Sequence, residues 1–270
     1  MIKLEQLYKE LLTRKVVTSN EITKLAASII DARVTNEYVH KEYIQKLLER
    51  GKLVRLRKGL YAALTPLETS ESFVPDKFLV ASKIRSRYYL GYHTALEFHG
   101  CAYSSYNQGY ICVRKKDRFD AFEYKNLSFK PVFTKDIETG VEKRSYLNHE
   151  IRVSSPERTF VDCLDKPGYA GGWEELLKSF EGLSGLNFEN IYQILRKFDK
   201  DLLYRKVGLV LEMMREHSVY YENLSDKTLG KIKNHLGKTP LYLEKGKSSS
   251  FNENWNLYVP KDFKEYLRGV

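Results

Sequence analysis

Residues 35–66, TNEYVHKEYIQKLLERGKLVRLRKGLYAALTP, combine a helical pattern with that of a basic hairpin. The apolar residues of this stretch follow helical spacing as far as Gly51, a residue that tolerates the left-handed conformation at the end of a helix. Beyond Gly51 the spacing changes to the alternation of a strand, Gly59 marks a turn, and residues 60–64 form a second extended run. A helix followed at once by a basic hairpin is typical of the second half of a winged helix-turn-helix module.

The residues before this stretch supply the first half of such a module. Residues 2–12 place apolar side chains at helical spacing, and Val16 and Val17 form a short extended link. Thr18 and Glu21 have the spacing of a capping box, which opens a second helix, and Thr35 can cap the third helix through its hydroxyl. The second helix is expected to turn five apolar residues inward: Ile22, Leu25, Ala26, Ile29 and Ile30. We therefore expect a winged helix-turn-helix domain at residues 1–66.

Polar residues on the outer face of the third helix are the candidates for reading DNA. In such a module the third helix enters the major groove, and its first turns reach base edges. The hairpin adds arginine and lysine, which can contact phosphates or enter the minor groove. The predicted DNA-binding residues are Asn36, Tyr38, His40, Lys41, Arg55, Arg57 and Lys58. The alternative is that the hairpin is a solvated strand face and that the third helix only covers a core.

The distribution of charge supports a polyanionic partner. The chain has 270 residues, a net charge of +10 and a sequence pI of about 9.2. Residues 1–66 hold 13 Lys and Arg against 7 Asp and Glu, so a quarter of the chain carries more than half of the excess positive charge. This asymmetry is expected if the N-terminal end binds double-stranded DNA.

The overall composition, 42% hydrophobic and 30% charged, is that of an ordinary soluble protein. No apolar run approaches the roughly 20 residues that cross a bilayer, and the N-terminal MIKLEQLYKELL is unlike a signal peptide. We therefore expect a cytoplasmic protein that makes no membrane contact. Cys101, Cys112 and Cys163 are odd in number and widely spaced, so buried thiols are expected rather than disulfides.

The sequence after residue 66 predicts a linker and a larger α+β domain. Residues 67–75 are rich in Thr, Ser, Glu and Pro and form a linker, which leaves residues 76–270 for this domain. Its first half favours helices at 77–87 and 94–99 and strands at 108–113, 121–133 and 147–153. Ser155 and Pro156 open a mainly helical half, with helices expected at 173–183, 188–198, 202–214 and 225–236. A final extended pair is expected at 241–243 and 255–259, around a flexible segment at 245–250.

Three blocks of sequence resemble those of a known family: LRKGLYAALTP (56–66), YYLGYHTALEFHG (88–100) and SSPERTFVDCLDKPGYAGGWEELL (154–177). Together they resemble AbiEi antitoxins, the transcriptional regulators of type IV toxin-antitoxin systems linked to abortive infection. The resemblance covers about residues 1–180. It implies a winged-helix domain that binds promoter repeats and represses its own operon, and a second domain needed for antitoxin activity. It also implies a nucleotidyltransferase-like toxin, neutralised without a stable complex.

The third block also has a structural interpretation. Glu157 is expected to favour the positive N-terminus of a helix, and Arg158 and Asp162 are spaced as i, i+4 partners. We interpret these three as mainly structural. A tight turn before the next helix is expected at Gly168, Gly171 and Gly172.

Motifs for the common enzyme classes are missing. Residues 246–248, Gly-Lys-Ser, lack the first glycine of a phosphate-binding loop, and no GxGxxG, GxSxG or HExxH occurs. His93, His99 and Cys101 lack a fourth ligand and a common face, so we expect neither a metal nor another cofactor. The prediction is a DNA-binding repressor and antitoxin that is not an enzyme.

Three alternatives remain open. Asp117 or Asp120, followed by Glu123 and Lys125, has the acidic-plus-ExK arrangement that holds Mg²⁺ in nucleases, although an exposed charged hairpin gives the same residues. A second alternative is a stand-alone winged-helix regulator without a toxin. A third is a regulator whose winged helix contacts protein instead of DNA.

Overall fold

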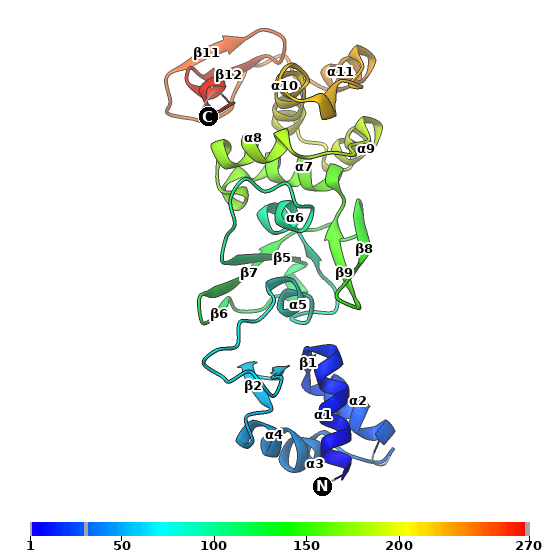
Figure 1. Ribbon diagram of the computed structural model, residues 1–270. Coiled ribbons are helices and arrows are strands. Elements are labelled where there is room, and N and C mark those ends of the chain that lie inside the picture. Colours follow the sequence, from blue (N-terminus) through cyan, green and yellow to red (C-terminus); the bar gives the residue numbers. More distant parts are fainter. Residues whose placement is uncertain (1, 30–31, 268–270) are drawn as a thin grey trace.

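The computed structural model describes residues 2–29 and 32–267 and has a mixed α+β fold, as predicted. Figure 1 shows an elongated molecule with the N-terminal helices at one end, a sheet in the middle and a helical layer at the other end. The C-terminal strands lie beside this helical layer. The prediction for Ile30 falls outside the described residues.

The N-terminal part contains helices and one small antiparallel sheet in the order β1-β3-β2. Its strands are β1 (Val16–Thr18), β2 (Leu53–Arg57) and β3 (Leu60–Ala63). Its helices are α1 (Ile2–Arg14), α2 (Ser19–Ile29), α3 (Asn36–Val39) and α4 (Gln45–Glu49). A π-helical turn, His40–Ile44, joins α3 to α4, so the expected third helix is one helical stretch with a π segment at its centre.

The predicted start and stop signals of these helices are confirmed. The Glu21 carboxylate accepts from the Thr18 amide at 2.8 Å and the Thr18 hydroxyl accepts from the Glu21 amide at 3.3 Å, which is a reciprocal capping box. The Thr35 hydroxyl accepts from the Tyr38 amide at 3.2 Å. Gly51 has φ +64°, and the next amide turns back to the Leu47 carbonyl at 2.9 Å.

The small sheet is buried on both faces. Tyr61 and Ala63 on β3 pack into the core of the N-terminal helices. Leu60 and Ala62, together with Leu56 on β2, belong instead to a cluster that includes the central sheet. No helix or strand lies between Ala63 and Lys77, which fits the expected linker, yet one apolar core runs from the hairpin into the central part. The division into domains at residues 67–75 stays a prediction.

The central part is a six-stranded mixed sheet in the order β6-β7-β5-β4-β9-β8. Its strands are β4 (Tyr89–Leu90), β5 (Gln108–Val113), β6 (Phe122–Tyr124), β7 (Leu127–Phe133), β8 (Val141–Tyr146) and β9 (His149–Ser154). One face packs against α5 (Lys77–Ser82) and the hairpin, and the other against α6 (Tyr92–Phe98) and the helices that follow. A short 3-10 helix, Lys115–Asp117, follows β5.

One strand prediction for this sheet is wrong, and one strand of the sheet was not predicted. The single strand expected at 121–133 is a hairpin of β6 and β7, which turns at Lys125 with φ +52°. The strand expected at 147–153 is β9, and it pairs with β8, which was not predicted. Strand β8 is half-buried or exposed along its whole length, so it lacks the apolar alternation that marks a strand in sequence. Helix α5 is also shorter than the expected 77–87.

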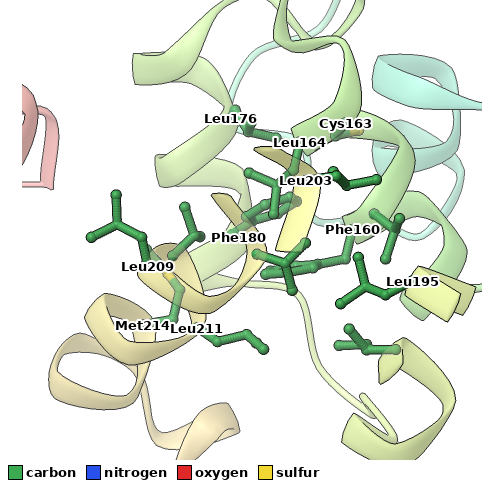
Figure 2. Close-up of a cluster of buried hydrophobic side chains, with 14 of the residues drawn as sticks. Phe160, Cys163, Leu164, Leu176, Phe180, Leu195, Leu203, Leu209, Leu211 and Met214 are labelled. Carbon is green, nitrogen blue, oxygen red and sulfur yellow. The ribbon is translucent and has the colours of Figure 1, made fainter. Parts of the chain in front are cut away.

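The helical layer confirms the predicted pattern. Its helices are α7 (Pro156–Asp165), α8 (Trp173–Glu181), α9 (Phe188–Phe198), α10 (Asp201–His217) and α11 (Asp226–Lys233), with 3-10 turns at Pro167–Ala170 and Val219–Tyr221. The Ser155 hydroxyl accepts from the Arg158 amide at 3.2 Å and Pro156 stands at the first position of α7, as expected. Figure 2 shows apolar side chains of α7, α8, α9 and α10 meeting in one buried cluster, among them Phe160, Phe180 and Leu195.

The C-terminal segment forms a second three-stranded sheet in the order β10-β12-β11. Its strands are β10 (Leu241–Tyr242), β11 (Ser249–Asn252) and β12 (Leu257–Pro260), followed by a 3-10 helix, Phe263–Leu267. The predicted pair is present, but its strands are parallel, and β11 occupies part of the segment expected to be flexible. Trp255 anchors this sheet: its indole is fully buried over Gly208 of α10 and donates to Glu212 at 2.9 Å.

Candidate nucleic-acid interface

The helical stretch 36–49 presents a polar face to solvent at the end of the molecule. Val39, Ile44 and Leu47 are buried in the core of the N-terminal helices. The four residues predicted to read bases are all exposed: Asn36, Tyr38, His40 and Lys41. One packed helical stretch therefore carries all four of these side chains at the surface.

Tyr38 packs against a second aromatic ring and lines a groove. Its ring lies edge-on to Tyr43 with a centroid distance of 6.1 Å, and it lines a groove of about 650 Å³ together with Lys46 and Arg50. Lys46 is held at 2.6 Å by Glu42, one turn away. The groove therefore extends the polar face toward α1, with Arg50 as an additional basic side chain that was not predicted from the sequence.

The hairpin residues fall into two groups. Arg55 and Lys58 are exposed, as a phosphate contact requires. Arg57 is half-buried, with its guanidinium carbon 4.6 Å from the centre of the Phe122 ring on β6. Burial and, after it, the neighbouring Arg85 lower the pKa of Arg57. Arg57 thus connects the hairpin to the central sheet, and its contact with DNA stays a prediction.

Further contacts hold the hairpin against α2 and hold α2 against the central part. The amide of Ser19 donates to the carbonyl of Gly59 at 2.9 Å, so the turn of the hairpin is bound to the start of α2. Glu21 of α2 pairs with Lys83 after α5 at 2.5 Å. In Figure 1 the hairpin accordingly lies between α4 and the central part, and the helical stretch forms the free end.

A buried polar network joins two of the sequence blocks. Arg158 is fully buried, donates to Asp162 at 2.8 Å and reaches the carbonyls of Thr139 and Asp136. The Tyr89 hydroxyl donates to Asp162 at 2.8 Å. Burial raises the pKa of Asp162, while Arg158 and Tyr89 act in the opposite direction. The predicted i, i+4 pair is confirmed, and its residues serve to fix α7 on the sheet.

A second buried network surrounds His93, which lies 3.1 Å from a Glu175 oxygen and 3.6 Å from a Glu97 oxygen. Lys77 pairs with Glu97, and the ring of Tyr106 stacks on His93. Burial alone would raise the pKa of Glu97, but its contacts with His93 and Lys77 outweigh that effect and lower it. Among the described residues no group of three or more His, Cys, Asp or Glu has a metal-binding arrangement.

Several residues considered for other chemistry are engaged in other contacts. His99 bonds to the Ser154 carbonyl at 2.8 Å, and the three cysteines are free thiols, of which Cys112 and Cys163 are buried. Of the residues considered for a nuclease site, Lys125 donates to the carbonyls of Glu71 and Phe73 in the linker. Across the described ranges, no helix is long and apolar enough to span a bilayer.

Comparison with known proteins bears on the fold. No family model matches the chain, and the comparison with curated proteins gives no match. Among solved structures, the chain is similar to the crystal structure of the RV2827C protein from Mycobacterium tuberculosis, with a TM-score of 0.66 and 15% sequence identity. The alignment covers 99% of this chain and 94% of that one, so the likeness extends over the whole α+β arrangement.

Proposed function

We propose that this protein is a DNA-binding transcriptional repressor whose N-terminal part is a winged helix-turn-helix. The observation that carries the proposal is the exposed face of residues 36–49, which holds Asn36, Tyr38, His40 and Lys41 at the free end of the molecule. The order of elements, from α1 through the α3–α4 stretch to the β2–β3 hairpin, supports a winged helix. The concentration of positive charge in residues 1–66 supports the same partner.

The helix is the main reading element in this proposal. An α-helix fits the major groove of B-form DNA, where each base pair has a distinct pattern of donors and acceptors. The exposed side chains of Arg55 and Lys58 add phosphate contacts, while Arg57 keeps the hairpin on Phe122. The firm attachment of the hairpin favours a module that docks on DNA as one rigid unit with the central sheet.

The biological role that we propose is the antitoxin of a type IV toxin-antitoxin system, acting in the cytoplasm. It rests on the resemblance of the three sequence blocks to AbiEi antitoxins. In the structure, Arg158 and Asp162 of the third block bond to Tyr89 of the second, and Glu175 of the third contacts His93 of the second. The second and third blocks thus pack together as one unit, which is consistent with a fold that this chain shares with that family. The partner is then a nucleotidyltransferase-like toxin.

The proposed phosphate contacts are tested by the double variant Arg55→Ala/Lys58→Ala. We expect affinity for every DNA sequence to fall by about tenfold, because phosphate contacts carry little sequence information. The slope of log affinity against log salt should also become less steep by about 0.9 for each phosphate that the variant no longer neutralises. Fluorescence anisotropy of a labelled duplex at several salt concentrations measures both quantities.

The matched control is Lys130→Ala/Lys227→Ala, which removes two exposed lysines from β7 and α11. This variant should bind DNA with wild-type affinity and salt slope. If the hairpin variant kept the affinity and slope of the wild type, the hairpin would have no part in DNA binding.

A further inference from the structure

A cavity of about 320 Å³ lies where the end of β7, the second half of α7 and the junction of α9 and α10 meet. Aromatic side chains line part of it, namely Tyr92, Phe133 and Phe198. Lysines line another part, among them Lys135, Lys166 and Lys197. The cavity lies in the central and helical parts of the molecule, away from the DNA-binding face.

The charges around the cavity are unbalanced. Lys200 pairs with Asp165 at 2.7 Å, and Arg158 pairs with Asp162. Lys135, Lys166 and Lys197, in contrast, form no ion pair with any described residue. The lining holds five Lys and Arg against three Asp, a net charge of +2, which attracts an anion, and lysine is a common ligand of phosphate.

The remaining acid at the cavity is already engaged. One carboxylate oxygen of Asp136 accepts from the amides of Glu138 and Thr139 at 2.9 and 3.0 Å, and the other lies 3.9 Å from Arg158. It forms no ion pair with the three lysines, and its charge lowers the excess at the cavity without cancelling it. The Lys166 ammonium donates to the Phe133 carbonyl at 3.5 Å and lies 5.7 Å from the centre of the Tyr169 ring, which leaves donors for a ligand.

One aromatic residue of the cavity lining has a strained backbone, and another is fixed by a buried arginine. Tyr92 has φ +55°, a left-handed conformation that costs energy in a residue with a bulky side chain. Gly91 before it cannot change, because a Cβ there would lie 2.8 Å from the sulfur of Cys112. Strain of this kind clusters at ligand sites. The Arg158 guanidinium lies 4.7 Å from the centre of the Phe198 ring and fixes that side chain.

We propose that this cavity binds a free nucleotide, with its phosphates on Lys135, Lys166 and Lys197 and its base against Phe133. Phe133 is 44% exposed, so one side of its ring is available for stacking. The volume is at the lower limit of small-molecule sites, which suits a single nucleotide and excludes a long oligonucleotide. Neither the DNA-binding face nor the antitoxin assignment is needed for this inference.

The test is calorimetric titration of the full chain with ADP, with adenosine and inorganic phosphate as separate probes. We expect ADP to bind and each fragment to bind at least about tenfold more weakly, because the site uses both the lysines and the aromatic surface. The variant Lys135→Ala/Lys197→Ala should weaken ADP binding by about tenfold or more. Both lysines are exposed, so this variant should keep the unfolding midpoint of the wild type.

A second variant separates a nucleotide site from a simple anion site. Phe133→Ala should weaken the binding of ADP and leave that of phosphate unchanged. The control variant Lys130→Ala/Lys227→Ala should bind ADP like the wild type. The proposal is overturned if ADP does not bind at millimolar concentration, if phosphate binds as tightly as ADP, or if the Lys135→Ala/Lys197→Ala variant binds ADP unchanged.

Discussion

Replacing Asp162 with alanine is expected to lower the free energy of unfolding by about 3–5 kcal/mol, since it removes one partner of a buried ion pair. Arg158 has no exposed surface, so its charge would be left without a carboxylate in the interior. The Tyr89 hydroxyl would lose its acceptor as well. Urea denaturation of the wild type and the variant measures this difference.

An exposed pair of the same chemistry provides the control. Asp226 pairs with Arg215 at 2.8 Å, but its side chain is 90% exposed, so Asp226→Ala should cost less than about 1 kcal/mol. The double variant Arg158→Met/Asp162→Leu should lose less stability than the sum of its two single changes, because neither charge is then left alone. Equal effects of Asp162→Ala and Asp226→Ala would contradict the assignment of a stabilising network.

Replacing Trp255 with alanine is expected to cost about 3–5 kcal/mol, because a large buried ring leaves a cavity. Trp255 is fully buried between α10 and the C-terminal sheet, and its indole donates to Glu212. The site has no spare volume: a Cβ on Gly208 would lie 1.9 Å from the Trp255 ring. Gly208→Ala should therefore displace the ring and shift its fluorescence toward longer wavelengths.

The control for Trp255 is another aromatic residue of the helical half. Tyr220 is 50% exposed, and Tyr220→Ala should change stability by less than about 0.5 kcal/mol. Guanidinium denaturation followed by circular dichroism compares the variants. If Trp255→Ala were as stable as Tyr220→Ala, the C-terminal sheet would not depend on its docking to α10.

The N-terminal elements were predictable because their signals are local. The capping pair Thr18 and Glu21, the Thr35 cap and the left-handed Gly51 each act within a few residues of the chain. The amphipathic helices α8, α9 and α10 were found for the same reason, since each keeps a regular apolar stripe. Patterns within short segments were therefore enough to predict these helices and the exposed residues of 36–49.

Features that depend on contacts between distant segments were not predictable. Alternation in β2 could not show that Arg57 meets Phe122, which is 65 positions further on. Strand β8 has no buried face, and β11 consists of Ser-Ser-Phe-Asn, so neither has a strand pattern of its own. Both strands form by pairing with a neighbouring strand. The lysine-lined cavity was not predictable for the same reason, because its residues come from separate helices and strands.

The ratio of two dissociation constants tests whether residues 36–49 bind DNA in a sequence-specific way. One is for the DNA upstream of the protein's own gene and the other for a scrambled duplex of equal composition, both near physiological salt. We expect the wild type to prefer its own DNA by about a thousandfold or more. The variant Asn36→Ala/Lys41→Ala should lose most of this preference while still binding scrambled DNA. Equal affinity of the wild type for the two duplexes would contradict the account.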